Sequence, residues 1–372
     1  MTLRSTLLDA PDACIEAADN FEALNALYLE RGWSDGLPIV PPSEERVERM
    51  LDYWDRAWDV PIARIPPRWG EATPLRLAAN AVMAGCRPES FPLVALAIEA
   101  MCDESFNLYG IQTTTHQCAP LAIVNGPIGR ELAINCGHNA FGPGWQSNAT
   151  IGRAIRLALV NIGGGIPGAG DMSTFGSPAK YSYCVAENEA ASPWEPLHVE
   201  RGFPAETTTV TVIGAEGPHN VNDHESVTGK GILRMIASTM MIPGANDATL
   251  GGGEPVIVLG PEHAATIAAD GYTKADVKQY LYEHAQIPYG HFSDEYIERR
   301  LEQRFPGRLE ASGPKAAVPM ANRPEDLMIV VVGGAGKHSA FIPTFGTTRA
   351  VTRPLRRADG EIARSVSELR RA

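Results

Sequence analysis

The apolar positions near the start of the chain recur with the period of an α-helix. They fall on Phe21, Leu24, Leu27 and Tyr28. A second helix is expected to begin near Ser43, where acidic residues follow a serine. Two more helices are predicted between residues 75 and 101, because Gly85 suits a helix end and Pro88 a helix start. We therefore expect a mainly helical N-terminal region over residues 1–104.

The rest of the chain alternates short apolar runs with glycine-rich turns. The runs occupy residues 121–124, 208–213, 255–259 and 327–332. Each has glycine at or just past its carboxyl end, as strands of α/β proteins often do, and ligands gather at strand carboxyl ends in such folds. The predicted fold class is therefore α/β, with a helical N-terminal region packed on strand–Gly-turn–helix units.

One internal similarity favours two related halves as an interpretation. Residues 148–168 and 226–244 both run from a polar start through an amphipathic helix to Ile-Pro-Gly. After the N-terminal region, we expect an α/β region with a polar cavity over residues 105–200. A second α/β region over residues 201–348 and an Arg-rich tail over residues 349–372 would follow. Acidic residues intersperse the seven arginines of the tail, so we interpret it as a solvated helix or frayed end rather than an RNA-binding segment.

Charge and cysteine content narrow the class of protein. The 372 residues carry a net charge of −12, which argues against nucleic acid or an anionic membrane as a partner. No apolar run is long enough to span a membrane, and residues 1–5 lead to Asp9 and Asp12 without the apolar stretch of a secretory signal. The six cysteines are sparse and form no CxxC pair, so a cytoplasmic protein with free thiols is expected.

Residues 105–170 stand out because they are polar but nearly uncharged. They carry only four charged side chains, Arg130, Glu131, Arg153 and Arg156. Neutral hydrogen-bonding groups set among glycines and apolar residues predict a buried polar cavity, since a buried amide or hydroxyl must find a partner or bind a ligand. We expect an enzyme that acts on a small polar or anionic metabolite.

Cysteine chemistry is the first candidate. His116 and Cys118 are two residues apart, share a face of an extended segment and could form a thiolate–imidazole pair. Cys86 precedes Arg87 near a predicted helix start, a setting that lowers a thiol pKa. For both cysteines the alternative is a small buried thiol that takes no part in chemistry.

Polar side chains of the same segment are candidates for substrate binding. They are Asn125, Asn135, His138, Asn148 and Arg153. Amide donors can polarise a substrate oxygen, and an arginine beside a helix start can hold an anion. The alternatives are an Asn/Gly-rich turn for the amides and a salt bridge for the arginine.

Two carboxylates follow a segment that is predicted to be a strand. Alternation would place Lys180, Ser182 and Cys184 on one face of a strand, with Glu187 and Glu189 at its end. Two such carboxylates can perform acid–base work or bind a metal, although solvated carboxylates are the alternative.

Metal and phosphate motifs are incomplete. His219 and His224 are five apart and miss the i, i+4 spacing of a zinc helix, so a metal site would need distant segments such as His116, His138 and Glu187. No cofactor is predicted, and a metal stays open. The Gly-rich run over residues 333–338 is too short for a P-loop and favours a nest of amides for an anionic group.

Five strings of the sequence form a combination, at residues 32–42, 82–89, 123–128, 148–153 and 184–194. Together they resemble a bacterial family whose members are labelled uncharacterised, thioredoxin-like or UGSC-associated proteins. The resemblance spans about residues 25–345 and implies a bacterial cytosolic enzyme with redox or sulfur chemistry. The chain departs from the thioredoxin label, because it has neither a CxxC nor a UGSC or CGSC string.

These patterns combine into one leading hypothesis and two alternatives. Cys118, or else Cys86, would be the nucleophile and His116 the base, with Asn125 and Asn148 as donors and Arg153 as the anion anchor. The alternatives are a metal-dependent hydrolase or lyase that uses histidines and Glu187, and a non-catalytic subunit whose low-charge segment is an interface. A homo-oligomer is expected, because few charges cross the middle third of the chain.

Overall fold

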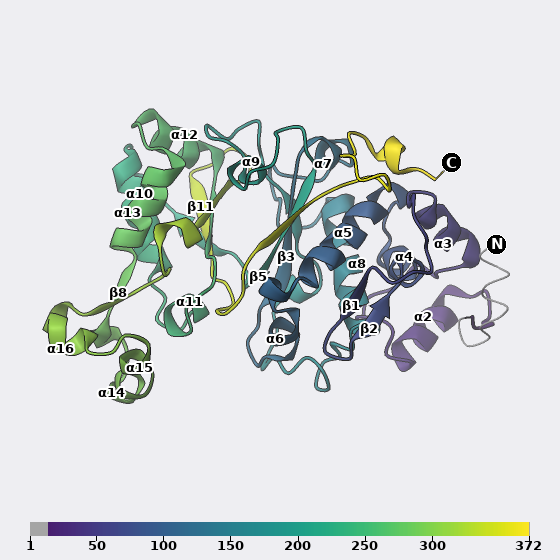
Figure 1. The fold of residues 1–372 in the computed structure, drawn as a ribbon, viewed down its shortest axis with the longest axis horizontal. Helices are drawn as coiled ribbons and strands as arrows, with labels where there is room; N and C mark the ends of the chain where they lie inside the picture. Colours follow the sequence, from purple (N-terminus) through teal and green to yellow (C-terminus); the bar gives the residue numbers. More distant parts are fainter. Residues whose placement is uncertain (1–13, 372) are drawn as a thin grey trace.

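The computed structural model describes residues 14–371, so the N-terminal stretch that lacks a predicted signal lies outside the described residues. Two four-stranded sheets stack face to face, and helices cover the outer face of each (Figure 1). The chain is therefore an α/β protein with four layers, helix–sheet–sheet–helix. Within the described residues no helix is both long and apolar enough to cross a bilayer.

The N-terminal helices form where the apolar periodicity and the start and stop residues predicted them. They are α2 (Phe21–Glu30), α3 (Glu44–Leu51), α4 (Pro74–Ala84) and α5 (Phe91–Met101). Asn20 caps α2 by accepting a hydrogen bond from the Ala23 amide, and α4 ends at Gly85 with a φ of +84°. A hairpin of β1 (Ala63–Ile65) and β2 (Gly70–Ala72) lies between α3 and α4, and α6 (Leu108–Thr113) follows α5.

The first sheet has the strand order β12-β5-β3-β4. Its strands are β3 (Ala119–Asn125), β4 (Cys184–Ala186), β5 (Thr209–Ala215) and β12 (Val351–Pro354). Only the β3–β4 pair is parallel. Side chains of β3 alternate: Ala122 and Val124 face α4, α5 and α8 (Gln146–Asn161), whereas Leu121 and Ile123 face the other sheet. Both faces of the strand are therefore buried.

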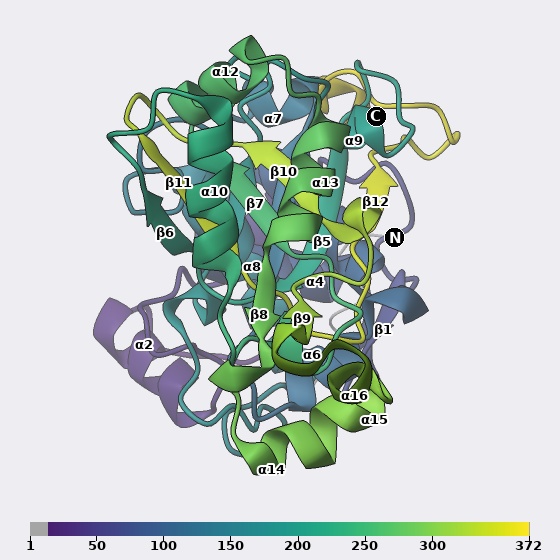
Figure 2. The ribbon, with the colours of Figure 1, turned by 90° about the vertical axis from the view of Figure 1, so that its left-hand side faces the viewer.

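The second sheet has the order β10-β7-β11-β6. Its strands are β6 (His219–Asn222), β7 (Val256–Leu259), β10 (Met328–Val331) and β11 (His338–Ile342). Figure 2 shows α10 (Gly229–Met240) and α13 (Lys274–His284) in front of this sheet, with α12 (Pro261–Ala269) above them. Ile257 and Leu259 pack under these helices, while Val256 and Val258 join the core between the sheets.

The two sheets repeat one pattern of strand pairing. In the first sheet β3, which Gly-Pro follows, pairs in parallel with the edge strand β4 and antiparallel with β5. In the second sheet β7, which Gly-Pro also follows, pairs in parallel with the edge strand β10 and antiparallel with β11. The fourth strand comes from the opposite half, because β5 continues into β6 of the second sheet and β11 into β12 of the first. The exchanging segments meet at a bridge between Ala215 and Thr344. This pairing supports two related halves, β3–β6 and β7–β12, each of which gives its last strand to the sheet of the other. The segments matched in the sequence are not equivalent in this repeat, because α8 follows β3 whereas α10 precedes β7.

The interpretation of residues 349–372 as a solvated helix or frayed end was wrong. The segment supplies β12, and its later apolar side chains pack against the N-terminal helices. Those side chains are Leu355, Ala363, Val366 and Leu369. The arginines alternate with these apolar residues and point outward, for example Arg353, which pairs with Asp103 at 2.8 Å. The prediction failed because it considered the charged residues of this segment and not the apolar residues that alternate with them, as in an amphipathic strand.

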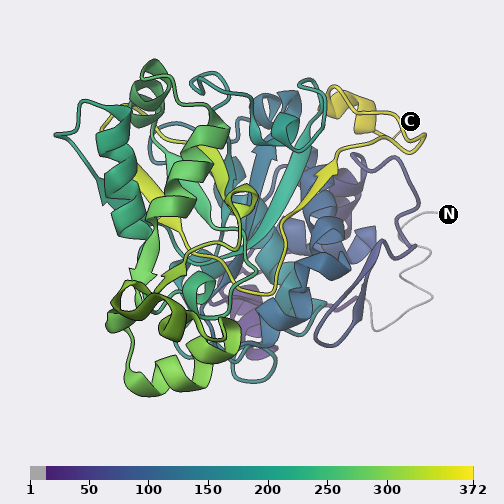
Figure 3. The ribbon, with the colours of Figure 1, turned by 60° about the vertical axis from the view of Figure 1, so that its left-hand side comes forward.

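The predicted strand over residues 180–189 is also shorter than expected. Lys180 ends a 3₁₀ turn (Pro178–Lys180), and only residues 184–186 pair as β4. The remaining elements are α7 (Pro127–Glu131), α9 (Leu197–Glu200), α11 (Asn246–Thr249), β8 (Gln286–Pro288), β9 (Ala317–Pro319), α14 (Asp294–Tyr296), α15 (Glu302–Arg304) and α16 (Arg308–Ser312). Figure 3 shows the α14–α16 segment below the helices of the second sheet, at the lower left.

Candidate functional site

The carboxyl ends of β3 and β4 bring together one amide and two carboxyl groups. The Asn125 side chain donates through Nδ2 to Glu187 Oε2 at 2.7 Å and to Glu189 Oε1 at 3.2 Å. Asn125 and Glu187 are buried, with exposed fractions of 1% and 4%. The parallel pairing of β3 with β4 causes this meeting, since parallel strands end at the same edge of a sheet.

Glu189 is held in place by its neighbours. Its Oε1 accepts a hydrogen bond of 2.6 Å from the Gly126 amide, and its Oε2 forms an ion pair of 2.8 Å with Arg130. Gly126 has a φ of +89°, and a Cβ there would collide with the backbone at Thr207, so only glycine fits this turn. The strand-end glycine thus lets a backbone amide reach the carboxylate.

Glu187 is a carboxyl group with one oxygen free. Its Oε2 also accepts from the Leu197 amide at 2.8 Å. Its Oε1 and the Asn125 Oδ1 are buried and have no hydrogen-bond partner among the described residues. Burial raises the pKa of Glu187, an effect that the Lys274 ammonium opposes and the Glu189 charge reinforces. A neutral carboxyl with an unpartnered oxygen can donate a proton to a ligand.

The second half of the molecule contributes charge to the same site. The buried Lys274 of α13 donates to Glu200 Oε2 at 3.0 Å, and Lys278 pairs with the same carboxylate. Burial acts against the Glu200 anion, but these two ammonium groups hold its pKa below the ordinary value. Sequence analysis missed Lys274 and Glu200, because each lies in a helix where a lysine or glutamate is unremarkable.

A cavity of about 280 Å³ is connected to this cluster through Asn188, although neither Asn125 nor the two glutamates line it. Its walls are formed by residues 138–141, by Val258 and Gly260, and by residues 332–336 and 338–340. Asn188, between the two glutamates, donates through its side chain to the Gly333 carbonyl of this wall at 3.2 Å. His138, a candidate site residue, is exposed. Its imidazole lies so close to Gly334 that a Cβ atom at residue 334 would overlap the ring.

The Gly-rich run over residues 333–338 already has an anion at one of its amides. The Gly336 amide donates to Glu262 Oε1 at 2.8 Å. The Gly333 amide donates to the Cys136 carbonyl at 2.8 Å. The predicted amide nest is therefore used, at least in these two amides, for contacts within the chain.

The predicted Cys118–His116 pair does not form. His116 Nε2 lies 2.8 Å from Glu216 Oε1, and its ring stacks on Phe345 with centroids 5.5 Å apart. Within the described residues the only hydrogen bond of the buried Cys118 thiol is a long one, 3.9 Å, to the Ile111 carbonyl. Burial raises the pKa of Cys118 to about 12. The prediction that His116 and Cys118 share a face of an extended segment was wrong, because the chain bends at residues 114–116 before β3 begins.

The expectation of a lowered thiol pKa at Cys86 was also wrong. The thiol donates to the Thr150 carbonyl at 3.2 Å, and burial raises its pKa to about 12. Arg87 does not face it, because its guanidinium donates to the Leu132 carbonyl and to Ser147. The small thiol fills a helix corner, which is the alternative that the sequence left open.

Three of the candidate substrate-binding residues hold the fold instead. Asn148 accepts from the Asn135 amide at 2.7 Å and donates back to the Asn135 carbonyl at 2.9 Å. The Asn135 side chain accepts from Gly137 and donates to the His138 carbonyl. Arg153 binds Asp35 through two hydrogen bonds of 2.8 Å. Since all three side chains are engaged, only Asn125 and His138 of this set remain available.

The histidines proposed as metal ligands are dispersed. Within residues 14–371, no group of three or more His, Cys, Asp or Glu side chains is arranged to hold a metal ion. His116 and Glu187 each lie in hydrogen-bonded networks of their own. His224 does meet another imidazole, that of His338, with their Nε2 atoms 3.1 Å apart.

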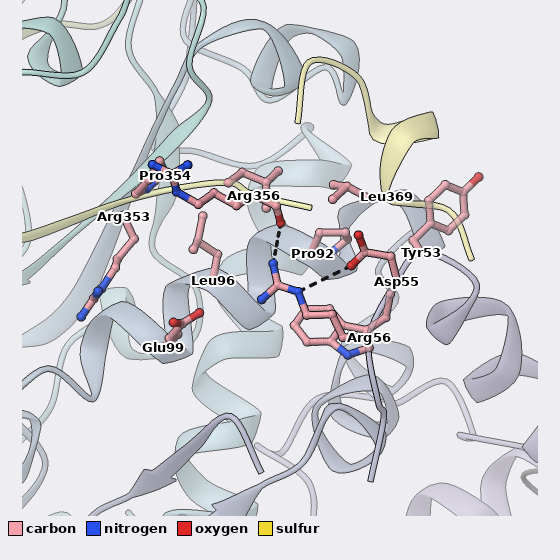
Figure 4. A pocket seen from close by; sticks show the side chains of 12 residues that line it. Tyr53, Asp55, Arg56, Pro92, Leu96, Glu99, Arg353, Pro354, Arg356 and Leu369 are labelled. Atoms are coloured by element: carbon pink, nitrogen blue, oxygen red, sulfur yellow. Dashed lines mark hydrogen bonds and ion pairs between the residues drawn. The ribbon is translucent and has the colours of Figure 1, made fainter. Parts of the chain in front are cut away.

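A second hollow, of about 160 Å³, lies between the C-terminal segment and the N-terminal helices (Figure 4). Arg56 crosses it and donates to the Arg356 carbonyl at 2.6 Å. Its guanidinium also lies 3.6 Å from Asp55 and 5.3 Å from the centre of the Trp54 ring. The hollow is therefore a packing seam that an arginine of the chain itself bridges.

Comparison with known proteins adds no family to this description. No protein-family model, curated protein or solved structure matches the chain.

Proposed function

We propose that the protein is an enzyme that moves a proton on a small polar metabolite, with Glu187 as the acid. One observation carries this proposal: Glu187 and Asn125 each present a buried oxygen without a protein partner at the carboxyl ends of two parallel strands. Buried polar atoms in folded proteins are nearly always hydrogen-bonded, so a substrate group or water is expected between them.

The surroundings of Glu187 suit a general acid. Burial and the nearby Glu189 anion favour the neutral form, which can donate a proton from Oε1 to a substrate oxygen or nitrogen. Once deprotonated, Glu187 is a carboxylate near the Lys274 ammonium, which stabilises that charge. Asn125 Oδ1 can accept a hydrogen bond from a substrate hydroxyl or amine. Hydrolases, lyases and isomerases all use such a step.

Arg130 is the group that we assign to an anionic part of the substrate. Its side chain is 65% exposed while one nitrogen holds Glu189. Arg153, the anchor favoured by the sequence, is unsuitable because Asp35 and two carbonyls occupy it. The thiol mechanism is less well supported than the carboxyl mechanism, since burial raises the pKa of Cys118 and of Cys86 to about 12.

The test combines ligand discovery with one isosteric variant. A panel of small hydroxylated and carboxylated metabolites is screened by thermal shift, and turnover of each ligand found is followed by NMR. Glu187→Gln should keep the fold and lower turnover by about 10²–10⁴-fold, the usual contribution of a general acid. Glu195→Gln, an exposed glutamate of the same connection, is the matched control. Unchanged turnover in Glu187→Gln would reject the assignment.

Two wider expectations remain part of the proposal. All six cysteines are free thiols, which fits the reducing interior of a bacterial cell. A homo-oligomer is supported by apolar side chains on the surface of one loop, those of Met172, Phe175 and Tyr181.

A further inference from the structure

Two exposed imidazoles meet at the edge of the second sheet. His338 begins β11 and pairs across the ladder with Asn222 of β6, and His224 follows β6 by two residues. Their Nε2 atoms lie 3.1 Å apart, and the rings are nearly perpendicular, with an interplanar angle of 81°. The pair is remote in sequence, and only the exchanged strand β6 brings it together.

A neighbouring amide fixes the tautomer of His338. Its Nδ1 lies 2.9 Å from Asn220 Oδ1, which can only accept. Nδ1 therefore carries the proton, and the Nε2 lone pair points toward His224. Metal-binding histidines usually have this arrangement, in which the second ring nitrogen donates to a fixed oxygen.

The backbone around His224 is also held in place. Lys337 donates to the His224 carbonyl at 3.1 Å, and His263 Nε2 donates to the Asp223 carbonyl at 3.0 Å. The Asp223 carboxylate accepts from the Ser226 amide at 2.9 Å. The ring of His338 and the backbone of His224 are thus held by contacts that do not use the Nε2 atoms.

We propose that His224 and His338 bind a late first-row divalent cation such as Zn²⁺. Imidazole nitrogens coordinate zinc at about 2.0–2.1 Å, so two of them on one ion lie about 2.9–3.4 Å apart for angles between square and tetrahedral. The observed separation of 3.1 Å falls in this range. The ion takes the place of the single proton that the two facing nitrogens otherwise share.

The position of the pair indicates what else such an ion could contact. His338 also lines the cavity of about 280 Å³, whose walls include His138 and the Gly-rich run over residues 333–336. Two protein ligands leave coordination positions for water or a small anion on that side. This site shares no residue with the Asn125–Glu187 cluster, so either assignment can fail without the other.

Zinc titration of the full-length, tag-free chain tests the proposal. The measurement is made by calorimetry in a Cys14→Ser background, because Cys14 carries an exposed thiol that could bind zinc itself. One zinc per chain is expected. His224→Ala or His338→Ala should weaken it by at least 10-fold, and Asn220→Ala by about 10-fold through loss of the hydrogen bond to Nδ1.

His219→Ala is the matched control, because His219 is an exposed histidine of the same strand that pairs with Phe341 instead. A second readout does not depend on zinc affinity: Cu²⁺ bound to the chain should show electron paramagnetic coupling to two imidazole nitrogens, reduced to one in His338→Ala. The proposal is overturned if no zinc binds, if both alanine variants bind as the parent does, or if His219→Ala loses binding equally. Melting curves establish that each variant is folded.

Discussion

The Arg153 guanidinium binds both carboxylate oxygens of Asp35, each at 2.8 Å, and ties the loop after α2 to helix α8. The same guanidinium donates to the Leu37 and Pro38 carbonyls, at 3.2 and 3.0 Å. Both charged side chains are mostly buried. Residues 33–38, Trp-Ser-Asp-Gly-Leu-Pro, therefore form a loop that packs against the core.

Replacing Arg153 should destabilise the protein strongly. Arg153→Ala leaves the Asp35 carboxylate and two carbonyls without their donor in a partly buried place, and the loss of one partner of such a pair costs about 3 kcal/mol. Urea unfolding measures the difference. Arg130→Ala is the control, because its ion pair is solvent-exposed on the arginine side and should contribute less than about 1 kcal/mol. Similar values for the two variants would contradict the structural role.

Stability should fall with rising pH through the buried carboxyl of Asp247. This carboxyl accepts from the Thr344 amide and hydroxyl at 2.8 and 2.6 Å, and burial raises its pKa to about 7. Between pH 4 and 7 the folded chain keeps a proton that the unfolded chain has lost, so unfolding becomes easier as pH rises, by up to about 1.4 kcal/mol per pH unit.

Asp247→Asn is the matched variant, because an amide can keep both contacts to Thr344. Its free energy of unfolding, relative to that of the parent, should improve steadily between pH 4.5 and 7 and then level off. Urea unfolding at each pH gives this difference and cancels other titrations, including that of Glu187. A difference that is constant over this range would show that Asp247 is ionised throughout.

Alkylation should rank the cysteines by exposure. Burial raises the pKa of Cys86, Cys102, Cys118 and Cys184 to about 12, so little thiolate exists in these four at pH 8. Cys14 is exposed and should react with iodoacetamide first. Mass spectrometry of the labelled peptides at short times gives the order. Labelling of Cys118 as fast as Cys14 would restore the thiol hypothesis.

Removal of the C-terminal segment should prevent folding. A chain that stops at residue 348 loses the edge strand β12 and five buried apolar side chains. Each of the four larger ones, which are valines and leucines, stabilises the fold by roughly 1.5–3 kcal/mol. We expect insoluble protein, or protein without a cooperative thermal transition. A chain that stops after Leu369 keeps these contacts and should melt almost as the parent does; equal behaviour of the two truncations would argue against a structural tail.

Self-association should depend on the loop over residues 170–182. Phe175 is 80% exposed there, and Met172 and Tyr181 are about half exposed. Apolar surface of this kind favours burial against a second copy. Light scattering should give more than 40 kDa at micromolar concentration, and Phe175→Ser should shift the mass toward that of the monomer. A monomeric parent chain would end this expectation.

The sequence determined the elements that depend on local patterns. The helical period from Phe21 to Tyr28 predicted α2, Gly85 and Pro88 marked the break between α4 and α5, and four apolar runs predicted β3, β5, β7 and β10. Each of these signals acts within a few residues, through side-chain periodicity or backbone freedom. The sequence also placed Asn125 and Glu187 at strand ends.

Tertiary structure alone decided which of the polar residues meet. Asn125 reaches Glu187 because β3 and β4 pair in parallel, and the His116 imidazole contacts Glu216 after the chain bends before β3. The exchange of β6 and β12 between the halves could not be read from the chain, because strand order depends on contacts between segments more than a hundred residues apart. Local sequence specifies the strands, whereas the packing of the two sheets specifies their partners.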